Sequence, residues 1–260
     1  MEFLLNIFKS IIKDQNKRQI IKKKLIKINI LFFNLLHGFK FNFRINPYNS
    51  KKYHIRNKEN IDIYSIPFFL KKNGTYFEAG ALDGYFSSPT YYLCKKKGWK
   101  GILVEPLDMF NQELALRRPK DIIVNKVLTS EEKLKTNKFA KFLNLHHSSK
   151  IFLNYEELEE WDKSILKKDP KIEKTIICTT IDRVLEEKNI TNLDLMALDL
   201  EGHELEALTG IDFNKTNIKY FLAETNKGRF EKIHSFLLNK KFNYLGNTND
   251  KDSLFVNQNL

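Results

Sequence analysis

From residue 75 onward, short apolar runs alternate with stretches of helical periodicity, and this alternation limits the fold more than any other feature. The predicted strands are residues 75–80, 101–105, 122–128, 193–200 and 218–224. Between them, apolar residues recur at the spacing of amphipathic helices. Strands that alternate with helices are typical of a mostly parallel sheet covered by helices on its faces. We therefore expect one α/β domain.

The end of the chain departs from this alternation. The strings FNYLG and SLFVN are strand-like, and the NTNDKD between them is rich in the residues that favour turns. Two short strands joined by such a turn form an antiparallel hairpin. A hairpin added to a parallel sheet is unlike an ordinary dinucleotide-binding fold.

Residues 130–170 interrupt the alternation and are predicted to be an insertion. His146 and His147 lie in this insertion, where loops that cover a substrate commonly fall. A polar loop explains these two residues equally well. Residues 175–178 then read as a short strand, and Thr179 or Thr180 as the N-cap of the next helix.

The first sixty residues differ in charge from the rest of the chain. They contain 14 Lys and Arg but only 3 Asp and Glu, so they carry most of the net charge of +12. Leu4, Ile7, Phe8 and Ile11 recur at helical spacing. The apolar runs are shorter than the roughly 18 residues of a membrane-spanning helix, and no signal-peptide cleavage pattern follows.

We therefore predict a basic helical extension over residues 1–60 and a domain over residues 61–260. Peripheral contact with an anionic membrane surface through residues 1–45 is one interpretation of the extension. Packing on the domain or on a partner subunit is another, and a general bias toward Lys, Asn and Ile is a third. Cys94 and Cys178 stand alone without a CxxC motif, which favours a reducing compartment. The predicted location is the cytoplasm, including the inner face of a membrane.

A glycine-containing turn follows the first predicted strand. The string EAGALDG places Gly80 and Gly84 at the spacing Gly-x-x-x-Gly. A turn between a strand and a helix brings backbone N–H groups close to a ligand, and glycine permits that approach. The spacing is not the GxGxxG of pyrophosphate binding, and no GxxxxGK[ST] motif occurs. A simple turn glycine is the alternative interpretation.

Glu105 strengthens the interpretation as a cofactor site. It ends the second predicted strand 25 residues after Gly80, and Pro106 follows it. An acidic residue about 20 residues beyond the glycine turn accepts hydrogen bonds from ribose hydroxyls in nucleotide-binding folds. A solvated carboxylate at a strand end is the alternative.

Four blocks in this order resemble the FkbM-type S-adenosylmethionine-dependent methyltransferases. The blocks are YFEAGALDGYFSSPTYYLCKKKGWKGILVEP, VNKVL, CTTIDRVL and MALDLEGHELEALTGI. The resemblance extends from about Tyr76 to the last strand and leaves residues 1–60 outside. Val127 and His203 depart from the family pattern, which often has Ala at the first position and Gly or an apolar residue at the second.

The resemblance implies a class I methyltransferase fold: a Rossmann-like, mostly parallel sheet with a C-terminal antiparallel hairpin. It also implies S-adenosylmethionine as the methyl donor and a hydroxyl oxygen as the usual acceptor. The cofactor-binding residues expected from the turn, the strand ends and the family blocks are Glu78, Gly80, Asp83, Gly84, Glu105, Pro106, Asn125 and Asp199.

Acidic residues at the ends of later strands indicate the acceptor side. Ligands of open parallel sheets bind outside the carboxyl ends of the strands, so Asp199, Glu201 and His203 should face the same crevice as Gly80. These three are the candidate catalytic residues, since a carboxylate or an imidazole accepts the hydroxyl proton. Alternatively, Asp199, Glu201 and Glu224 hold Mg²⁺, which lowers the pKa of a bound alcohol. For Glu201 and Glu204, a favourable interaction with the helix dipole is the structural alternative.

Three functions remain open at this point. The first is an O-methyltransferase that acts on a small acceptor, such as a sugar of a surface glycan or its precursor. The second is a nucleic-acid methyltransferase that uses the basic extension; the chain lacks the Asn/Asp-Pro-Pro-Tyr type of motif expected for base methylation. The third is a non-catalytic module that retains the cofactor pocket.

Deleting residues 1–45 should leave cofactor binding intact, because the family blocks begin well after the deleted segment. Calorimetry with S-adenosylmethionine should give the same affinity for the truncated and full-length proteins. Salt-sensitive binding to anionic liposomes that is lost on deletion would favour the peripheral membrane role. A truncated protein that unfolds would instead make the extension part of the core or of a dimer interface.

Overall fold

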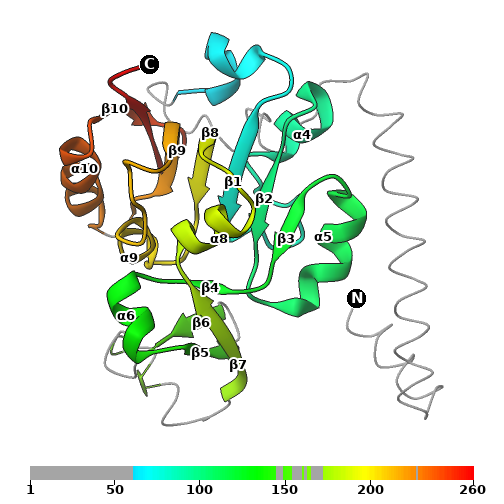
Figure 1. Cartoon of the computed structure of the whole chain (residues 1–260), viewed down its shortest axis with the longest axis vertical. Coiled ribbons are helices and arrows are strands. Elements are labelled where there is room, and N and C mark those ends of the chain that lie inside the picture. Colours follow the sequence, from blue (N-terminus) through cyan, green and yellow to red (C-terminus); the bar gives the residue numbers. More distant parts are fainter. Residues whose placement is uncertain (1–60, 145–148, 154–159, 161–162, 165–171, 227) are drawn as a thin grey trace.

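The computed structural model describes residues 61–144, 149–153, 160, 163–164, 172–226 and 228–260 (Figure 1). The predicted helical extension, together with His146 and His147, lies outside the described residues. Among the described helices, none combines the length and the apolar character that crossing a bilayer requires.

A seven-stranded sheet, here called the main sheet, organises the domain, with the order β10-β11-β9-β8-β1-β2-β3. Five strands are parallel: β1 (Thr75–Ala79), β2 (Lys100–Val104), β3 (Ile122–Val124), β8 (Asn192–Leu198) and β9 (Asn217–Glu224). The hairpin of β10 (Phe242–Asn247) and β11 (Asp252–Asn257) adds to β9 in antiparallel pairing. The predicted parallel strands and terminal hairpin are therefore confirmed, and the fold is that of class I methyltransferases.

Side chains of successive strand residues point to opposite faces of the main sheet, and both faces are buried. Phe77 and Ala79 belong to one core, whereas Tyr76 belongs to the other. The first core contains residues of α8 (Ile181–Glu187), α9 (Glu204–Leu208) and α10 (Phe230–Asn239). The second contains residues of η1 (Ile63–Ser65), η2 (Pro67–Leu70), α4 (Tyr91–Lys97) and α5 (Asn111–Arg117). Helices on both faces explain why the parallel strands are nearly continuous apolar runs.

One predicted strand, residues 122–128, is wrong, because the chain divides it between two sheets. β3 ends at Val124, and β4 (Val127–Leu128) pairs instead with β7 (Ile172–Thr179). The cause lies at Asn125, whose side-chain amide donates to the Glu105 carbonyl at 2.8 Å. This bond replaces a backbone bond at the strand end, so the ladder between β2 and β3 stops there.

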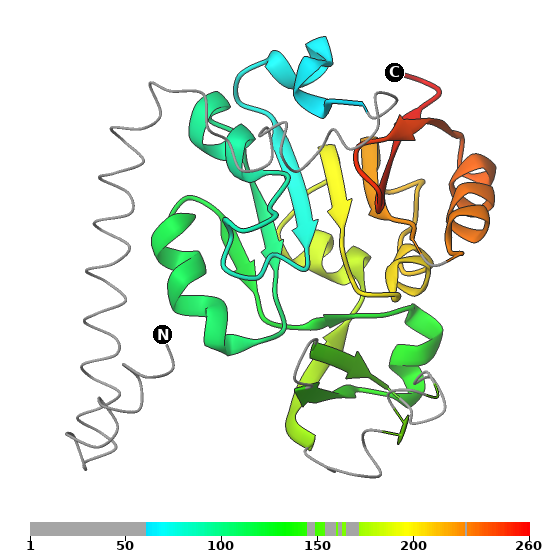
Figure 2. The same ribbon diagram turned by 180° about the vertical axis from the view of Figure 1, so that it is seen from behind.

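The predicted insertion, residues 130–170, contributes to a second sheet with the order β4-β7-β5-β6. It contains α6 (Glu131–Thr136), β5 (Phe139–Asn144) and β6 (Ser149–Phe152). The predicted short strand at 175–178 is longer, spanning all of β7, and joins this second sheet. Figures 1 and 2 show the second sheet beyond the ends toward which the arrows of β1 and β8 point. It therefore borders the sheet edge at which ligands of parallel sheets bind.

Two helix starts agree with the sequence, with small differences in length. The Thr180 hydroxyl accepts from the Arg183 backbone N–H at 3.2 Å and caps α8. Of the two threonines proposed for this cap, Thr180 is the one used. After β8, α9 begins directly after His203, which occupies its N-cap position.

A buried arginine holds the chain that follows β1. The Arg118 side chain has no exposed surface. Its guanidinium donates to the Gly84 carbonyl, Ser88 Oγ, Thr90 Oγ1, the Tyr76 hydroxyl and Asp121 Oδ2, at 2.6–3.1 Å. Ser88 and Thr90 in turn donate to the Glu78 carboxylate. One cation thus joins β1, the segment after it and the turn before β3.

Replacing Arg118 by Ala should lower the free energy of unfolding by about 3–5 kcal/mol, because Glu78 and Asp121 would remain buried without their cation. Denaturant unfolding monitored by circular dichroism measures this change. Arg183→Ala is the matched control, since Arg183 forms an exposed pair with Glu131; this variant should unfold almost like the wild type. Equal effects of the two substitutions would contradict a structural role for the Arg118 network.

Candidate functional site

The site begins where β1 and β8 end side by side. Gly80 has a φ of 80°, and a Cβ atom there would lie 2.0 Å from the Asp199 carbonyl oxygen. Two backbone bonds fix this approach: Gly80 N–H donates to the Val104 carbonyl at 3.0 Å, and Asp199 N–H to the Ala79 carbonyl at 3.1 Å. Both the left-handed conformation and the contact require glycine. The predicted turn glycine therefore brings the predicted acidic residue directly to its side.

Asp83 and Gly84 shape the loop that follows. The Asp83 carboxylate accepts from the backbone N–H groups of Tyr85 and Phe86 at 2.9 and 2.8 Å and pairs with Arg117. Gly84 has a φ of 71°, and a Cβ atom there would lie 2.9 Å from Arg118 Cγ. Both residues thus have structural reasons for their identity, and their contact with a cofactor stays a prediction.

Glu105 links the glycine turn to the end of β2. Its carboxylate is 3% exposed and accepts from the Leu82 and Leu107 backbone N–H groups, both at 2.9 Å. Burial raises the pKa of Glu105, and the two backbone bonds partly oppose that rise. Each carboxylate oxygen keeps a second lone pair for a ligand hydroxyl. Asn125 contributes to the site indirectly, because its side-chain amide donates to the Glu105 carbonyl and holds Glu105 in place.

Two pockets lie on either side of Glu105. The strand-end pocket is lined by residues at or near the ends of β1, β8 and β9 and by the first residue of β11, among them Glu78, Gly80, Asp199, Leu222 and Asp252. The inter-sheet pocket is apolar and lies between the main and second sheets; Pro106, Leu128, Phe152, Leu153, Leu200 and His203 line it. Glu105 lies between the two pockets. Leu82, whose N–H it accepts, lines the strand-end pocket, and its chain neighbours Val104 and Pro106 line the inter-sheet pocket.

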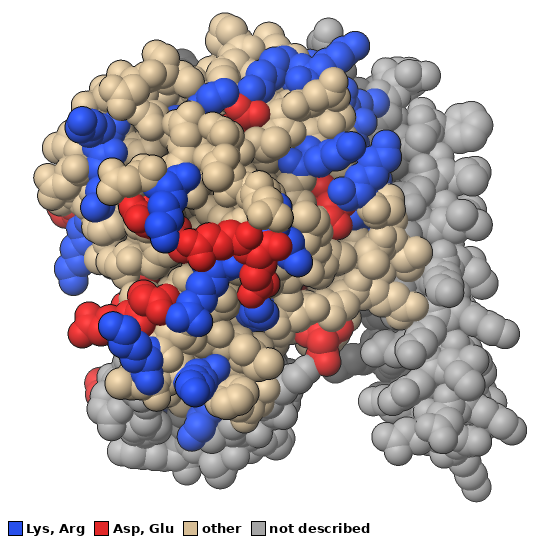
Figure 3. All heavy atoms as spheres, in the orientation of Figure 1, with Lys and Arg blue, Asp and Glu red and all other residues tan. Residues whose placement is uncertain are grey.

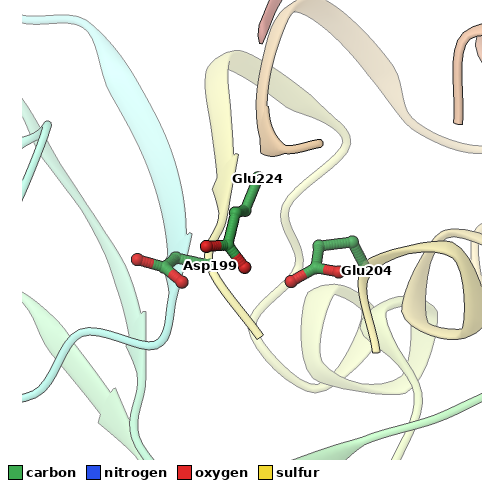
Figure 4. A group of neighbouring side chains, drawn as sticks. All are labelled: Asp199, Glu204 and Glu224. Atoms are coloured by element: carbon green, nitrogen blue, oxygen red, sulfur yellow. The ribbon is translucent and has the colours of Figure 1, made fainter. Parts of the chain in front are cut away.

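Three carboxylates gather beside the strand-end pocket. Oxygen atoms of Asp199, Glu204 and Glu224 all lie within 4.8 Å of one another (Figure 4). Glu201, which we predicted for this group, is exposed on a left-handed turn with a φ of 52° and lies outside it. The short turn between β8 and α9 directs Glu204 inward in its place.

The two buried carboxylates are held by different groups. Glu204 Oε1 accepts from the Leu200 and Gly202 backbone N–H groups at 2.8 and 3.1 Å. Glu224 Oε2 accepts from Arg229 Nη2 at 3.1 Å. The Arg229 guanidinium crosses over Gly202, where a Cβ atom would lie 2.6 Å from Nη1. Gly202 also has a φ of 111°, a conformation that L side chains rarely adopt, so glycine is required there.

The pKa of Asp199 is strongly raised. Although its side chain opens to solvent, loss of hydration in the crevice raises the pKa of Asp199 to about 8. The nearby carboxylates of Glu224, Asp252, Glu201 and Glu204 raise this pKa further. A carboxylate with a pKa near neutrality is suited to accept a proton from a reacting group.

The three predicted catalytic residues occupy different places. Asp199 lines the strand-end pocket, His203 lines the inter-sheet pocket, and Glu201 is exposed. Two residues of the site, Arg229 and Asp252, were not predicted. Arg229 follows Glu224 closely in the sequence, which is a signal of an ion pair, whereas Asp252 comes from the distant β11 and had no local signal.

Comparisons with known proteins identify the family of the chain. The FkbM methyltransferase domain matches residues 78–244, from the Glu78 strand to the terminal hairpin. A human methyltransferase 10 domain-containing protein is 12% identical, with a TM-score of 0.40, covering 72% of this chain and 73% of the other. A TehB-like S-adenosylmethionine-dependent methyltransferase from Corynebacterium glutamicum is 10% identical, with a TM-score of 0.36, covering 75% and 89%. No curated protein sequence matches the chain.

The family match spans more than half of the 260 residues and includes the glycine turn, Glu105 and the acidic group. The chain therefore belongs to the FkbM methyltransferase domain family and is an S-adenosylmethionine-dependent methyltransferase.

Proposed function

We propose that the protein transfers the methyl group of S-adenosylmethionine to a hydroxyl oxygen of a small acceptor, a sugar of a surface glycan or its precursor. The observation that carries this proposal is Asp199, a carboxylate with a raised pKa in the crevice beside the glycine turn. It is available to take the proton that a hydroxyl must lose.

The residues around Glu105 suit the cofactor. Gly80 lets the turn after β1 approach Asp199 closely, and the Glu105 carboxylate has free lone pairs for ribose hydroxyls. The apolar inter-sheet pocket, with Pro106 and Leu200, suits a flat base. The strand-end pocket, with Glu78 and Asp199, suits the cationic amino-acid end. When bound, the cofactor supplies an electrophilic methyl group on a positively charged sulfur.

Asp199 then acts on the acceptor. When bound, the cofactor would supply the methyl group to an acceptor oxygen in the crevice, and Asp199 would accept the proton that this oxygen loses. The ionised Asp199 carboxylate also attracts the positively charged sulfur of the bound cofactor before the methyl group is transferred. Positioning of the two reactants in line supplies much of the rate.

The lining of the crevice favours a hydroxyl-rich acceptor. Asp199 and Asp252 are carboxylates, which accept hydrogen bonds but do not donate when ionised. Phe86 lines the same pocket with 58% of its surface exposed, so its ring is available to stack on the apolar face of a sugar. Incubation with labelled S-adenosylmethionine and a panel of nucleotide sugars and envelope glycans tests the assignment; label on a base of nucleic acid instead would overturn it.

Surface charge gives less support to a nucleic-acid substrate. On the face in Figure 3, Lys and Arg alternate with Asp and Glu across the described residues, without a continuous basic surface. The many basic residues among 1–60 remain consistent with the alternative proposal, in which residues 1–45 contact a membrane surface. The isolated cysteines support the proposal of a cytoplasmic location.

Glu105→Gln should weaken S-adenosylmethionine binding more than tenfold. A hydrogen bond to a charged group contributes roughly 1.5–3 kcal/mol, and Gln keeps the shape of the side chain while removing its charge. Calorimetry measures the affinity, and thermal melting checks that the loop still folds. Glu132→Gln, an exposed position on α6, is the control and should bind normally. Unchanged affinity of Glu105→Gln would remove Glu105 from the cofactor site.

Cofactor binding should strengthen as the pH rises from 6 to 8, with chelator present. The reason is that Asp199 is largely protonated below a pKa of about 8, whereas the cationic sulfur favours the ionised form. Binding should therefore release protons, which calorimetry in buffers of different ionisation enthalpy detects. Asp199→Asn should abolish both the proton release and the pH dependence and lower turnover at least about a hundredfold. A pH-independent affinity in the wild type would contradict the position of Asp199 beside the cofactor.

A further inference from the structure

Glu204 has an oxygen that no described group satisfies. The Glu204 side chain has no exposed surface, and its Oε2 atom has no hydrogen-bond partner. The closest approach of Arg229 is Nε at 3.9 Å, beyond hydrogen-bond distance, and this Nε also lacks a partner. Figure 4 shows the Glu204 carboxylate pointing toward Asp199 and Glu224. A buried carboxylate oxygen without a partner is costly, so its position suggests a ligand.

The negative charges of Asp199, Glu204 and Glu224 likewise call for a positively charged ligand. Asp199, Glu204 and Glu224 carry three negative charges when ionised, and Arg229 compensates one through its 3.1 Å bond to Glu224. Lys251 lies 4.0 Å from Glu224, but its side chain is 65% exposed and solvated. With all three carboxylates ionised, two negative charges therefore remain around a space bordered by carboxylate oxygens. One divalent cation would neutralise them.

We propose that Asp199, Glu204 and Glu224 together bind a hard divalent cation of the Mg²⁺ and Mn²⁺ class. Carboxylate oxygens are the ligands these ions prefer. Opposite ligands of an octahedral Mg²⁺ lie about 4.2 Å apart, since each bond is about 2.1 Å. Two of the three oxygens can take opposite positions and the third a neighbouring one about 3.0 Å from each, so oxygens within 4.8 Å of one another reach an octahedral arrangement through small side-chain movements.

The role of this ion rests on the proposed function. The acceptor hydroxyl would complete its coordination sphere, and the ion would lower the pKa of that hydroxyl. Glu201, which the sequence suggested as a ligand, is replaced by Glu204, and Arg229 stays bound to Glu224 as the counterion on the outer side.

Mn²⁺ binding to the full-length, chelator-treated protein without cofactor tests the site. Electron paramagnetic resonance of free Mn²⁺ should report one bound ion, and Mg²⁺ should compete for it. Glu204→Gln should weaken binding at least tenfold, while its amide oxygen still accepts from Leu200 and Gly202. Glu231→Gln makes the same chemical change at an exposed position of α10 and should bind Mn²⁺ normally. If Glu204→Gln does not melt as a folded protein, Asp199→Asn serves as the second variant, with the same expected loss.

No Mn²⁺ uptake at millimolar concentration would overturn the cation site. Equal uptake by the wild type and a folded Glu204→Gln variant would also overturn it. Methyl transfer, measured separately with and without chelator, distinguishes this failure from failure of the proposed function. Turnover that persists in chelator, without Mn²⁺ uptake, overturns the ion but keeps the O-methyltransferase; Mn²⁺ uptake lost in Glu204→Gln supports the site even if no sugar accepts the methyl group.

Discussion

The contact between Gly80 and the Asp199 carbonyl is the constraint on which the rest of the site depends. Because a Cβ atom at Gly80 would lie 2.0 Å from that oxygen, the turns after β1 and β8 can meet only if residue 80 is glycine. Their meeting sets the distance between the half of the crevice that contains Glu105 and the half that contains the acidic group. A larger residue would separate the cofactor side from the side on which the acceptor reacts.

The two halves manage buried charge in opposite ways. On the cofactor side, Arg118 is fully buried and its donors reach five acceptors, so Glu78 and Asp121 lie beside a fixed cation. A network with its polar groups satisfied is rigid and holds one loop conformation. On the acceptor side, Arg229 reaches only part of the carboxylate group, and the pKa of Asp199 is raised to about 8. The rigid Arg118 network therefore lies next to the acidic group, in which Asp199 is the reactive carboxylate.

The sequence predicted the main sheet well because each parallel strand is buried on both faces and appears as an apolar run. It predicted Gly80, Glu105 and Asp199 at one edge because strand ends share that edge. It did not predict that residues 122–128 divide between two sheets, since one amide bond from Asn125 decides where β3 stops. Nor did it distinguish Glu201 from Glu204, because a single left-handed residue in the turn decides which carboxylate faces inward.

Acidic side chains this close together would move apart on a flexible surface, so the backbone must hold them. Asp199 follows β8 and Glu224 ends β9, and the two strands pair in parallel along nearly their whole length. Glu204 is fixed by two backbone N–H donors from the turn that carries it. The repulsion is therefore maintained by the same hydrogen bonds that build the sheet, and a bound cation or the positive sulfur of the cofactor relieves it. Part of the folding stability is in this way given up to keep an ionisable carboxylate at the place where, in the proposed function, it accepts the hydroxyl proton.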